Sequence, residues 1–293
     1  MAVEKAKETD AELVLASDPD ADRVGAAVKN NEGEWVLLNG NQTALMFVYY
    51  LITRWKELGK VKGKEYIVKT IVTTELIRTI AEQNGVELYD VYTGFKWIAD
   101  VMKKNEGKKS YIGGGEESYG FLCEDFVRDK DAVSACAILA EIAAWAKDQG
   151  MTMYQLLQKI YVQYGFSKEK GISVVKKGKS GAEEIEAMMK KFRENPLQEI
   201  AGSKVAYFYD YASLKGFDYA ENETLTLDMP TTSNVLQYFT EDNTKVSIRP
   251  SGTEPKIKFY CEVHSKVKSL EELPAAEKAA AEKIEAIKAS LGI

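Results

Sequence analysis

Short apolar runs alternate with longer stretches of helical periodicity through the first half of the chain. The runs have the length of β-strands and stand at 13–16, 24–28, 35–38, 66–72, 86–91 and, running into a glycine cluster, 111–112. The helical stretches stand at 42–58, 74–83, 95–102, 132–147 and 152–164. Strands and helices in this alternating order favour an α/β layer domain.

The pattern changes near Ser167, where strand signals begin to outnumber helical ones. An amphipathic helix is predicted by apolar residues spaced i, i+3, i+4 and i+7, namely Ile185, Met188, Met189 and Phe192. Strand-like runs stand at 171–175, 205–209, 235–239, 246–248 and 257–263. A last helix is expected from about Leu270, because Ser269 and Glu272 have the spacing of a capping box. The pattern from Ser167 onward therefore predicts an α+β domain.

Composition narrows the classes of protein to consider. The 293 residues carry a formal charge of -6, and no basic stretch interleaves with aromatics, so nucleic acid is not expected as a partner. The longest uncharged apolar run, 44–52, is too short to span a bilayer, and the charged first ten residues do not resemble a secretory signal. Three scattered cysteines suggest reduced thiols in a cytoplasmic protein. The single histidine, His264, excludes a zinc site built from several histidines.

The first loop with candidate chemistry is the DPDADR segment, which directly follows a predicted strand. Asp18, Asp20 and Asp22 stand at i, i+2 and i+4, so their carboxylates can converge on one hard cation. An EF-hand loop would need glycine and glutamate where Arg23 and Lys29 stand, so that calcium site is rejected. The pattern favours a Mg²⁺ site open to a phosphate oxygen. A solvated acidic turn is the alternative.

Two further loops follow predicted strands in the same domain. In the TGFK segment, Lys96 lies off the apolar helical face, so its charge is available to a cleft, although a solvated lysine at a helix start is an equal alternative. In the GGGEESYG segment, glycines allow close backbone approach to a ligand. On an extended loop Glu116 and Ser118 would face the same way and suit the hydroxyls of a sugar. A plain turn is the alternative, and the segment is not a P-loop.

The fourth loop is RPSGTEP, between two predicted strands. Arg249 offers a guanidinium fork, while Ser251 and Thr253 offer hydroxyls. Gly252 would allow backbone N–H groups to form an anion nest. The pattern favours a phosphate cradle over a tight strand connection, which would not call for an arginine and two hydroxyls.

These four loops, in this order, resemble those of the α-D-phosphohexomutase superfamily. The segments DPDADR, GEESYG and RPSGTEPKIKFY look most like the phosphoglucomutase branch related to phosphopentomutase-like members. The stretch 128–131 is similar to a family segment whose lysine sits near the substrate. The resemblance covers essentially the whole chain, and its motifs are specific in combination.

The resemblance implies a division of this chain into family domains. It maps 1–38 as a remnant of domain 2 with the metal loop, 39–168 as the mixed-sheet α/β domain 3 and 169–293 as the α+β domain 4. In the family, domain 1 carries a serine that is phosphorylated in the active enzyme. No segment like Thr-Ala-Ser-His-Asn-Pro occurs in these residues. The resemblance therefore implies a C-terminal part that lacks the catalytic serine.

The same resemblance assigns roles residue by residue. Mg²⁺ would be bound by Asp18, Asp20 and Asp22. The catalytic assignments are Arg23, near the serine phosphate, and Lys69 and Lys130, as acid/base or phosphate contacts. Substrate would be held by Thr93, Gly94, Lys96, Glu116, Ser118, Arg249, Ser251, Gly252 and Thr253, with sugar hydroxyls on Glu116 and Ser118 and the non-reacting phosphate on the residues from Arg249 onward.

The implied activity of the intact enzyme is the interconversion of hexose 1-phosphate and hexose 6-phosphate. The phosphoserine would donate its phosphate to the sugar, and glucose 1,6-bisphosphate would turn over in the cleft as intermediate and activator. The implied partners are glucose 1-phosphate, glucose 6-phosphate and the missing N-terminal domains. This chain alone is expected to be inactive. The alternative is a non-catalytic sugar-phosphate-binding module.

Overall fold

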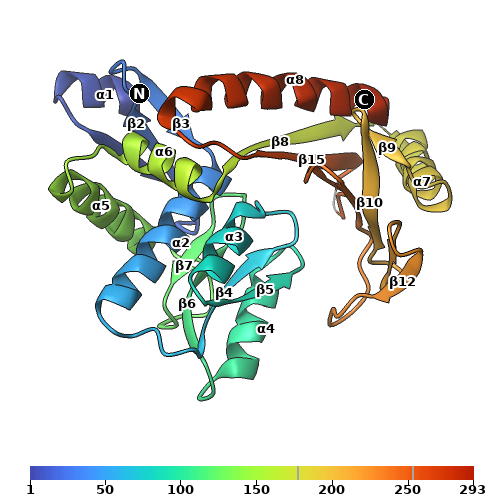
Figure 1. The fold of residues 1–293 in the computed structure, drawn as a ribbon, viewed down its shortest axis with the longest axis horizontal. Helices are drawn as coiled ribbons and strands as arrows, with labels where there is room; N and C mark the ends of the chain where they lie inside the picture. The colour runs from blue at the N-terminus through green and yellow to red at the C-terminus, as the bar shows by residue number, and fades with distance from the viewer. Residues whose placement is uncertain (177, 253) are drawn as a thin grey trace. The chain divides into compact units, whose positions relative to one another are not determined.

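A computed structural model describes residues 1–176, 178–252 and 254–293. The chain forms two compact units. Unit 1 comprises Met1–Gly165 with Lys268–Leu270, and unit 2 comprises Phe166–Val267 with Glu271–Ile293. Figure 1 shows the elements of both units along the chain.

Unit 1 begins with a small antiparallel sheet. A short helix, α1 (Ala2–Glu8), precedes the strands β1 (Leu13–Ser17), β2 (Val24–Lys29) and β3 (Trp35–Leu38). The strands lie in the order β1-β2-β3, and the DPDADR segment is the connection between the first two. The three strands were predicted from their apolar runs, whereas α1 was not, because its charged residues leave only Ala6 buried.

The main sheet of unit 1 has the order β5-β4-β6-β7. Its strands are β4 (Glu65–Thr70), β5 (Glu87–Val91), β6 (Ser110–Gly115) and β7 (Phe121–Cys123). The strand β4 pairs in parallel with β5 and β6, while β7 returns antiparallel to β6. The expected mixed-sheet α/β domain is confirmed.

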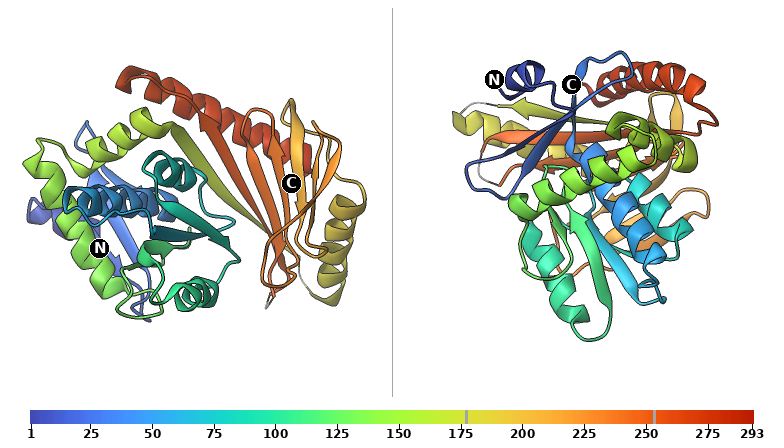
Figure 2. Two further views of the ribbon diagram at one scale, coloured as in Figure 1. Left: turned by 60° about the horizontal axis from the view of Figure 1, so that its bottom comes forward. Right: turned by 90° about the vertical axis from the view of Figure 1, so that its left-hand side faces the viewer.

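Helices lie on both faces of this sheet (Figures 1 and 2). The helices are α2 (Gly40–Glu57), α3 (Leu76–Gln83), α4 (Phe95–Asn105), α5 (Ala132–Asp148) and α6 (Met153–Tyr164). The helix α4 covers one face, where Phe95, Ile98 and Met102 join Tyr66 and Val68 of the sheet in a buried cluster. The helix α2 packs on the other face against β6 and β7. Helices on both faces bury parallel strands, as expected for this class.

The glycine cluster predicted as a ligand loop is instead the end of strand β6. Gly113, Gly114 and Gly115 are buried and pair with both neighbouring strands. A Cβ at Gly114 would overlap the carbonyl of Val68, and one at Gly115 would overlap that of Gly120. The glycines therefore serve close backbone packing inside the sheet, which corrects the expectation that they approach a ligand.

Unit 2 is built on a seven-strand antiparallel path of order β12-β11-β10-β13-β14-β15-β8, with the short β9 beside β10. The strands are β8 (Phe166–Val175), β9 (Glu199–Ile200), β10 (Ser203–Asp210), β11 (Lys215–Asp218), β12 (Glu223–Thr226), β13 (Leu236–Thr240), β14 (Lys245–Pro250) and β15 (Lys256–Ser265). The longest pairing joins β15 to β8 over ten register positions. The expected α+β domain is confirmed.

Two helices cover one face of this sheet, α7 (Gly178–Glu194) and α8 (Leu273–Leu291). Phe192 of α7 meets Phe259 of β15 edge to face, with ring centroids 6.2 Å apart. The last helix begins at Leu273, after a 3₁₀ turn at Leu270–Glu272. The residue before this helix, its N-cap Glu272, makes no side-chain cap hydrogen bond, and the capping box between Ser269 and Glu272 stays a prediction.

No helix among the described residues is long and apolar enough to cross a membrane. The cysteines Cys123, Cys136 and Cys261 are all free thiols. Burial raises the pKa of the Cys261 thiol to about 12, so this side chain stays protonated and behaves as a small apolar group.

Candidate functional site

Three loops of unit 1 meet at the carboxyl edge of its main sheet. They follow β4, β5 and β6, and span 71–75, 92–94 and 116–120. Ligands of open α/β sheets bind outside the carboxyl ends of the strands. Two of the predicted segments, TGFK and GEESYG, therefore lie where the topology places a binding site.

The loop after β6 is a tight turn. The Glu116 amide donates to the Gly120 carbonyl at 2.8 Å, and the next two residues form the turn itself. The expectation of an extended loop at this segment is therefore wrong. Glu116 is 7% exposed, and its Oε1 accepts a hydrogen bond from the Gly94 amide at 2.7 Å. This bond joins the GEESYG turn to the TGFK loop, while Ser118 is half-buried beside it.

The same turn is held from the β4 side by two buried hydroxyls. Thr70 Oγ1 and Thr73 Oγ1 lie 2.8 Å apart and contact Glu117 Oε2 at 3.3 and 3.4 Å. The Glu117 amide donates to Thr73 Oγ1 at 3.2 Å. Both threonines are fully buried. These residues were missed by sequence reasoning, although a run of threonines directly after a buried strand is an available signal.

A glycine permits a third contact to this turn. A Cβ at Gly40, the first residue of α2, would overlap the carbonyl of Glu117 and crowd the amide of Tyr119. Only a residue without a side chain allows the start of α2 to approach so closely. The GEESYG turn is thus fixed by α2, by the loop after β4 and by the loop after β5.

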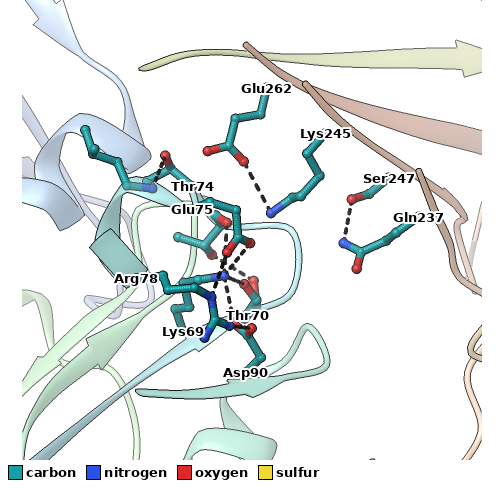
Figure 3. Close-up of polar contacts among 12 residues, drawn as sticks. Lys69, Thr70, Thr74, Glu75, Arg78, Asp90, Gln237, Lys245, Ser247 and Glu262 are labelled. Carbon is teal, nitrogen blue, oxygen red and sulfur yellow. Dashed lines mark hydrogen bonds and ion pairs between the residues drawn. The ribbon is translucent and has the colours of Figure 1, made fainter. Parts of the chain in front are cut away.

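Lys69 is at the end of β4 and is 1% exposed (Figure 3). Its Nζ lies 2.7 Å from Asp90 Oδ1 and 2.9 Å from Glu75 Oε1. Arg78 contacts the same two carboxylates, with Nε 3.1 Å from Glu75 Oε2. The ammonium of Lys69 is therefore engaged in a buried charge network that ties β4 to β5 and α3.

The DPDADR loop is organised by its first aspartate. Asp18 Oδ1 accepts from the backbone amides of Asp22 and Arg23 at 3.1 and 3.2 Å. Asp20 is exposed, and Ala21 between them has a left-handed φ of 54°. Among the described residues no three carboxylate, cysteine or histidine side chains are gathered as a metal-ligand group. Asp18, Asp20 and Asp22 therefore share a loop without converging.

Asp22 instead pairs with Lys130. Lys130 Nζ lies 2.7 Å from Asp22 Oδ2, and the hydrogen bond from this lysine is the main cause that lowers the pKa of Asp22. The other oxygen, Asp22 Oδ1, is buried and accepts no hydrogen bond in the described part of the chain. Hard oxygen donors with one unsatisfied atom fit Mg²⁺ chemically. The arrangement around them does not present a closed ligand set.

Backbone hydrogen bonds join the metal loop to the edge of the main sheet. The Val24 amide donates to the Tyr119 carbonyl at 3.1 Å, and the Ala132 amide donates to the Ala21 carbonyl at 3.0 Å. Gly120 has no side chain, so the stem of Lys130 lies directly over it. The DPDADR loop, the GEESYG turn and Lys130 therefore form one local cluster within unit 1.

The remaining predicted residues of unit 1 lie in or next to these loops. The Arg23 side chain is 51% exposed, with its Nε 3.8 Å from Asp22 Oδ1. Thr93 is half-buried, and Gly94 is the N-cap of α4 with a φ of 109°. Lys96 is exposed, with its Nζ 4.9 Å from the centre of the Trp97 ring.

The RPSGTEP loop of unit 2 connects β14 to β15. A cavity of about 200 Å³ is lined by Arg249, Pro250, Ser251, Glu254, Lys256 and Lys258. Lys256 pairs with Glu254, which lowers the pKa of that exposed carboxyl. The two lysines were missed by sequence reasoning, although both stand within the quoted RPSGTEPKIKFY segment. Gly252 is exposed with φ outside the left-handed region, and Thr253 lies outside the described residues.

Buried polar side chains continue across the same sheet of unit 2. Lys245 Nζ lies 3.2 Å from Glu262 Oε2, and Gln237 Nε2 donates to Ser247 Oγ at 2.7 Å (Figure 3). His264 Nε2 lies 2.7 Å from Glu262 Oε1. Burial lowers the pKa of His264, but the Glu262 charge outweighs it and the pKa is raised overall.

Family models match both halves of the chain. Residues 39–164 match the phosphoglucomutase/phosphomannomutase alpha/beta/alpha domain III, and residues 173–280 match the C-terminal domain of the same family. A phosphoglucomutase of Staphylococcus aureus (strain MRSA252) is 38% identical over 259 residues, and one of Staphylococcus haemolyticus is 33% identical over 260. The first alignment covers 88% of this chain and 46% of the relative. The chain therefore spans about half the length of the curated relatives it matches.

Solved structures share the fold. A putative phosphomannomutase from Thermus thermophilus matches 93% of this chain and 46% of its own, with a TM-score of 0.56 and 19% identity. A phosphoglucomutase/phosphomannomutase family protein from Burkholderia thailandensis matches 98% of this chain and 48% of its own, with a TM-score of 0.58 and 19% identity. Two adjacent family models and a relative at 38% identity point to the same family. This chain belongs to the phosphoglucomutase/phosphomannomutase family.

Proposed function

We propose that this chain supplies the metal, sugar and phosphate loops of an enzyme that interconverts hexose 1-phosphate and hexose 6-phosphate in the cytoplasm. One observation carries the proposal. The DPDADR loop, the TGFK loop, the GEESYG turn and Lys130 come from distant parts of the sequence, yet the bonds Glu116–Gly94, Val24–Tyr119 and Lys130–Asp22 hold them at one edge of one sheet. A purely structural domain has no need to gather these groups.

The proposed roles follow from the chemistry of each group. The Gly94 amide holds one carboxylate oxygen of Glu116, and the second oxygen would bind a sugar hydroxyl together with the hydroxyl of Ser118. Thr93, Lys96 and Arg23 line the same edge and contribute polar and cationic contacts. In unit 2, Arg249, Ser251, Gly252 and Thr253 would hold the phosphate that is not reacting, because a guanidinium binds phosphate with two parallel hydrogen bonds.

The carboxylate oxygens of the metal loop are donors that suit the Mg²⁺ ion required by this function. Asp18, Asp20 and Asp22 would hold Mg²⁺, which when bound would neutralise charge on the phosphoryl group being transferred. Lys130, near Asp22, is proposed as a phosphate contact. The burial of Lys69 between Asp90 and Glu75 supports a positioning role at the end of β4 in place of proton exchange.

The chemistry of the parent enzyme also requires a group outside these 293 residues. They hold no serine motif of the family kind, so the phosphoserine and the return of phosphate from glucose 1,6-bisphosphate would depend on a separate domain. This same observation favours a second candidate function, a sugar-phosphate-binding module without catalysis.

A reconstitution assay tests the two candidates. Glucose 1-phosphate turnover is followed with Mg²⁺ and glucose 1,6-bisphosphate, using the chain alone and the chain mixed with separately expressed domains that carry the serine motif. We expect turnover only in the mixture, and its loss with Arg249→Ala. Binding of glucose 6-phosphate without turnover in any mixture supports the binding module, and neither binding nor turnover rejects both.

A further inference from the structure

The metal loop already holds a cation, which is the ammonium of Lys130. Lys130 Nζ lies 2.7 Å from Asp22 Oδ2 and 3.3 Å from Asp129 Oδ1, and its side chain is 15% exposed. Lys130 is 108 positions after Asp22 in the sequence. The site that the family motif predicts for a divalent cation is therefore engaged by a monovalent one supplied by the protein.

The surroundings of Asp22 are incomplete with this cation in place. Asp22 Oδ1 is buried and receives no hydrogen bond in the described residues, so one half of the carboxylate is left unsatisfied. A buried acceptor without a partner is costly. Asp18 belongs to the same loop, where its Oδ1 accepts hydrogen bonds from the Asp22 and Arg23 amides at 3.1 and 3.2 Å. The ammonium of Lys130 thus leaves unsatisfied an oxygen of Asp22 that a divalent ion could bind.

We propose that Lys130 is a built-in lock on the metal loop: a divalent cation binds by displacing the Lys130 ammonium from Asp22, which releases that ammonium to contact a substrate phosphate. The inference rests on the proposed function for the identity of the phosphate. Metal and phosphate would then bind cooperatively, because each favours the state in which Asp22 and Lys130 are separated, and such coupling is reciprocal.

The local structure permits this exchange. The Lys130 stem crosses Gly120, where no side chain blocks it. Asp129 is 72% exposed and offers the ammonium only a weak surface contact. The long lysine side chain can change its rotamer while its backbone stays in place. The Ala132–Ala21 hydrogen bond keeps that backbone beside the metal loop.

The test measures Mn²⁺ binding to the 293-residue chain by electron paramagnetic resonance. The variants are Lys130→Met, which removes the lock, Lys130→Arg, which keeps a cation, and Lys104→Met, which removes an equal charge from an exposed site on α4. In Lys130→Met the ammonium no longer competes with the metal for Asp22, so Mn²⁺ binding should tighten about tenfold or more. Lys130→Arg and Lys104→Met should bind as the unmodified chain does, and Asp22→Asn should abolish the gain.

A second readout follows the ammonium itself. The ¹⁵N resonance of Lys130 Nζ, protected by its ion pair, should broaden or shift as Mg²⁺ is added. Equal Mn²⁺ affinity in Lys130→Met and the unmodified chain, an equal gain in Lys104→Met, or a Lys130 resonance unmoved at saturating Mg²⁺ overturns the proposal. Circular dichroism confirms that each variant is folded. Tighter Mn²⁺ binding in a chain that reconstitutes no turnover would support the lock and count only against the proposed catalysis.

Discussion

Arg249 and Lys258 lie directly opposite each other in the β14–β15 pairing of unit 2. Neither forms an ion pair with a carboxylate in the described part of the chain. Like charges directly opposite on neighbouring strands are destabilising. The arrangement is therefore explained better by an anion that the pair receives than by the stability of the hairpin.

This pair gives the first prediction, in which a substitution can lower the affinity for a ligand and yet raise the stability of the ligand-free chain. Arg249→Ala should weaken glucose 6-phosphate binding by roughly ten- to a hundredfold, because a hydrogen bond to a charged group contributes about 1.5–3 kcal/mol. Lys258→Thr should also weaken binding, yet should stabilise the ligand-free chain by about 0.2–1 kcal/mol by removing the repulsion. Titration calorimetry and thermal unfolding measure the two effects.

The control for this pair is Lys256→Thr. Lys256 lines the same cavity but is paired with Glu254, so its loss should not raise the melting temperature. A rise equal to that of Lys258→Thr would show that general charge reduction is the cause. Unchanged affinity in both Arg249→Ala and Lys258→Thr would remove the cavity from the phosphate site.

The two buried threonines give the second prediction. Thr73→Val keeps the shape of the side chain but removes the hydroxyl that receives the Glu117 amide and contacts its carboxylate. We expect faster hydrogen exchange at the Glu117 amide and weaker sugar-phosphate binding, by about fivefold to tenfold, since one or two neutral hydrogen bonds contribute about 1 kcal/mol each.

Thr73→Ser is the matched variant, because it restores the hydroxyl at the cost of one methyl group. It should recover both the protection of the amide and the affinity. If valine and serine at this position behave alike, the hydroxyl has no part in holding the GEESYG turn. Amide exchange is measured without substrate, so this result does not depend on the proposed function.

Lys69 gives the third prediction. Lys69→Met removes the buried ammonium that Asp90 and Glu75 share, and breaking a buried charge network costs about 3 kcal/mol or more. The melting temperature of unit 1 should therefore fall sharply. Lys69→Arg should be folded and should keep turnover in the reconstituted enzyme. Lost turnover in a stably folded Lys69→Arg chain would instead support the acid/base role implied by the family resemblance.

Strong periodic patterns were sufficient to predict most of the fold. The helices α2, α5, α6 and α7 and the strands β10 and β13–β15 match segments whose apolar residues recur with the period of the element. The strands β11 and β12 were missed because each is only four residues long and has a single large apolar residue, which leaves no apolar alternation. The strand end at Gly113–Gly115 was missed because glycine contributes no apolar signal.

The candidate site was less accessible to sequence reasoning than the fold. The motifs identified loops that the structure places near one another in unit 1, but the contacts that shape these loops join residues far apart in the chain, such as Thr73 with Glu117 and Asp22 with Lys130. The extended-loop expectation at Glu116 failed because the Glu116–Gly120 hydrogen bond closes a turn there. Such pairings depend on tertiary structure, which local patterns do not encode.

The last prediction concerns pH and the single histidine. His264 faces Glu262 on its own strand β15, Glu169 on β8 and Lys245 on β14. Burial and Lys245 disfavour the protonated ring, whereas the two carboxylates favour it more, so the folded-state pKa of His264 lies above its ordinary value of 6.5. A group whose pKa is raised by folding stabilises the folded state while it is protonated.

The raised pKa of His264 determines how the stability of unit 2 changes with pH. The stabilisation from His264 should be fully present below pH 6.5 and should be lost as pH rises through the higher folded-state pKa. The melting temperature of unit 2 should therefore fall between pH 6 and pH 9 more steeply in the unmodified chain than in His264→Gln. At pH 6 the variant should be less stable by about 1.5–3 kcal/mol, the contribution of a hydrogen bond between charged groups. Calorimetry of both chains across this range measures the difference, and NMR titration of the ring gives the pKa directly. Parallel pH profiles for the two chains would show that His264 does not gain its proton on folding, and a ring pKa below 6.5 would reverse the predicted sign.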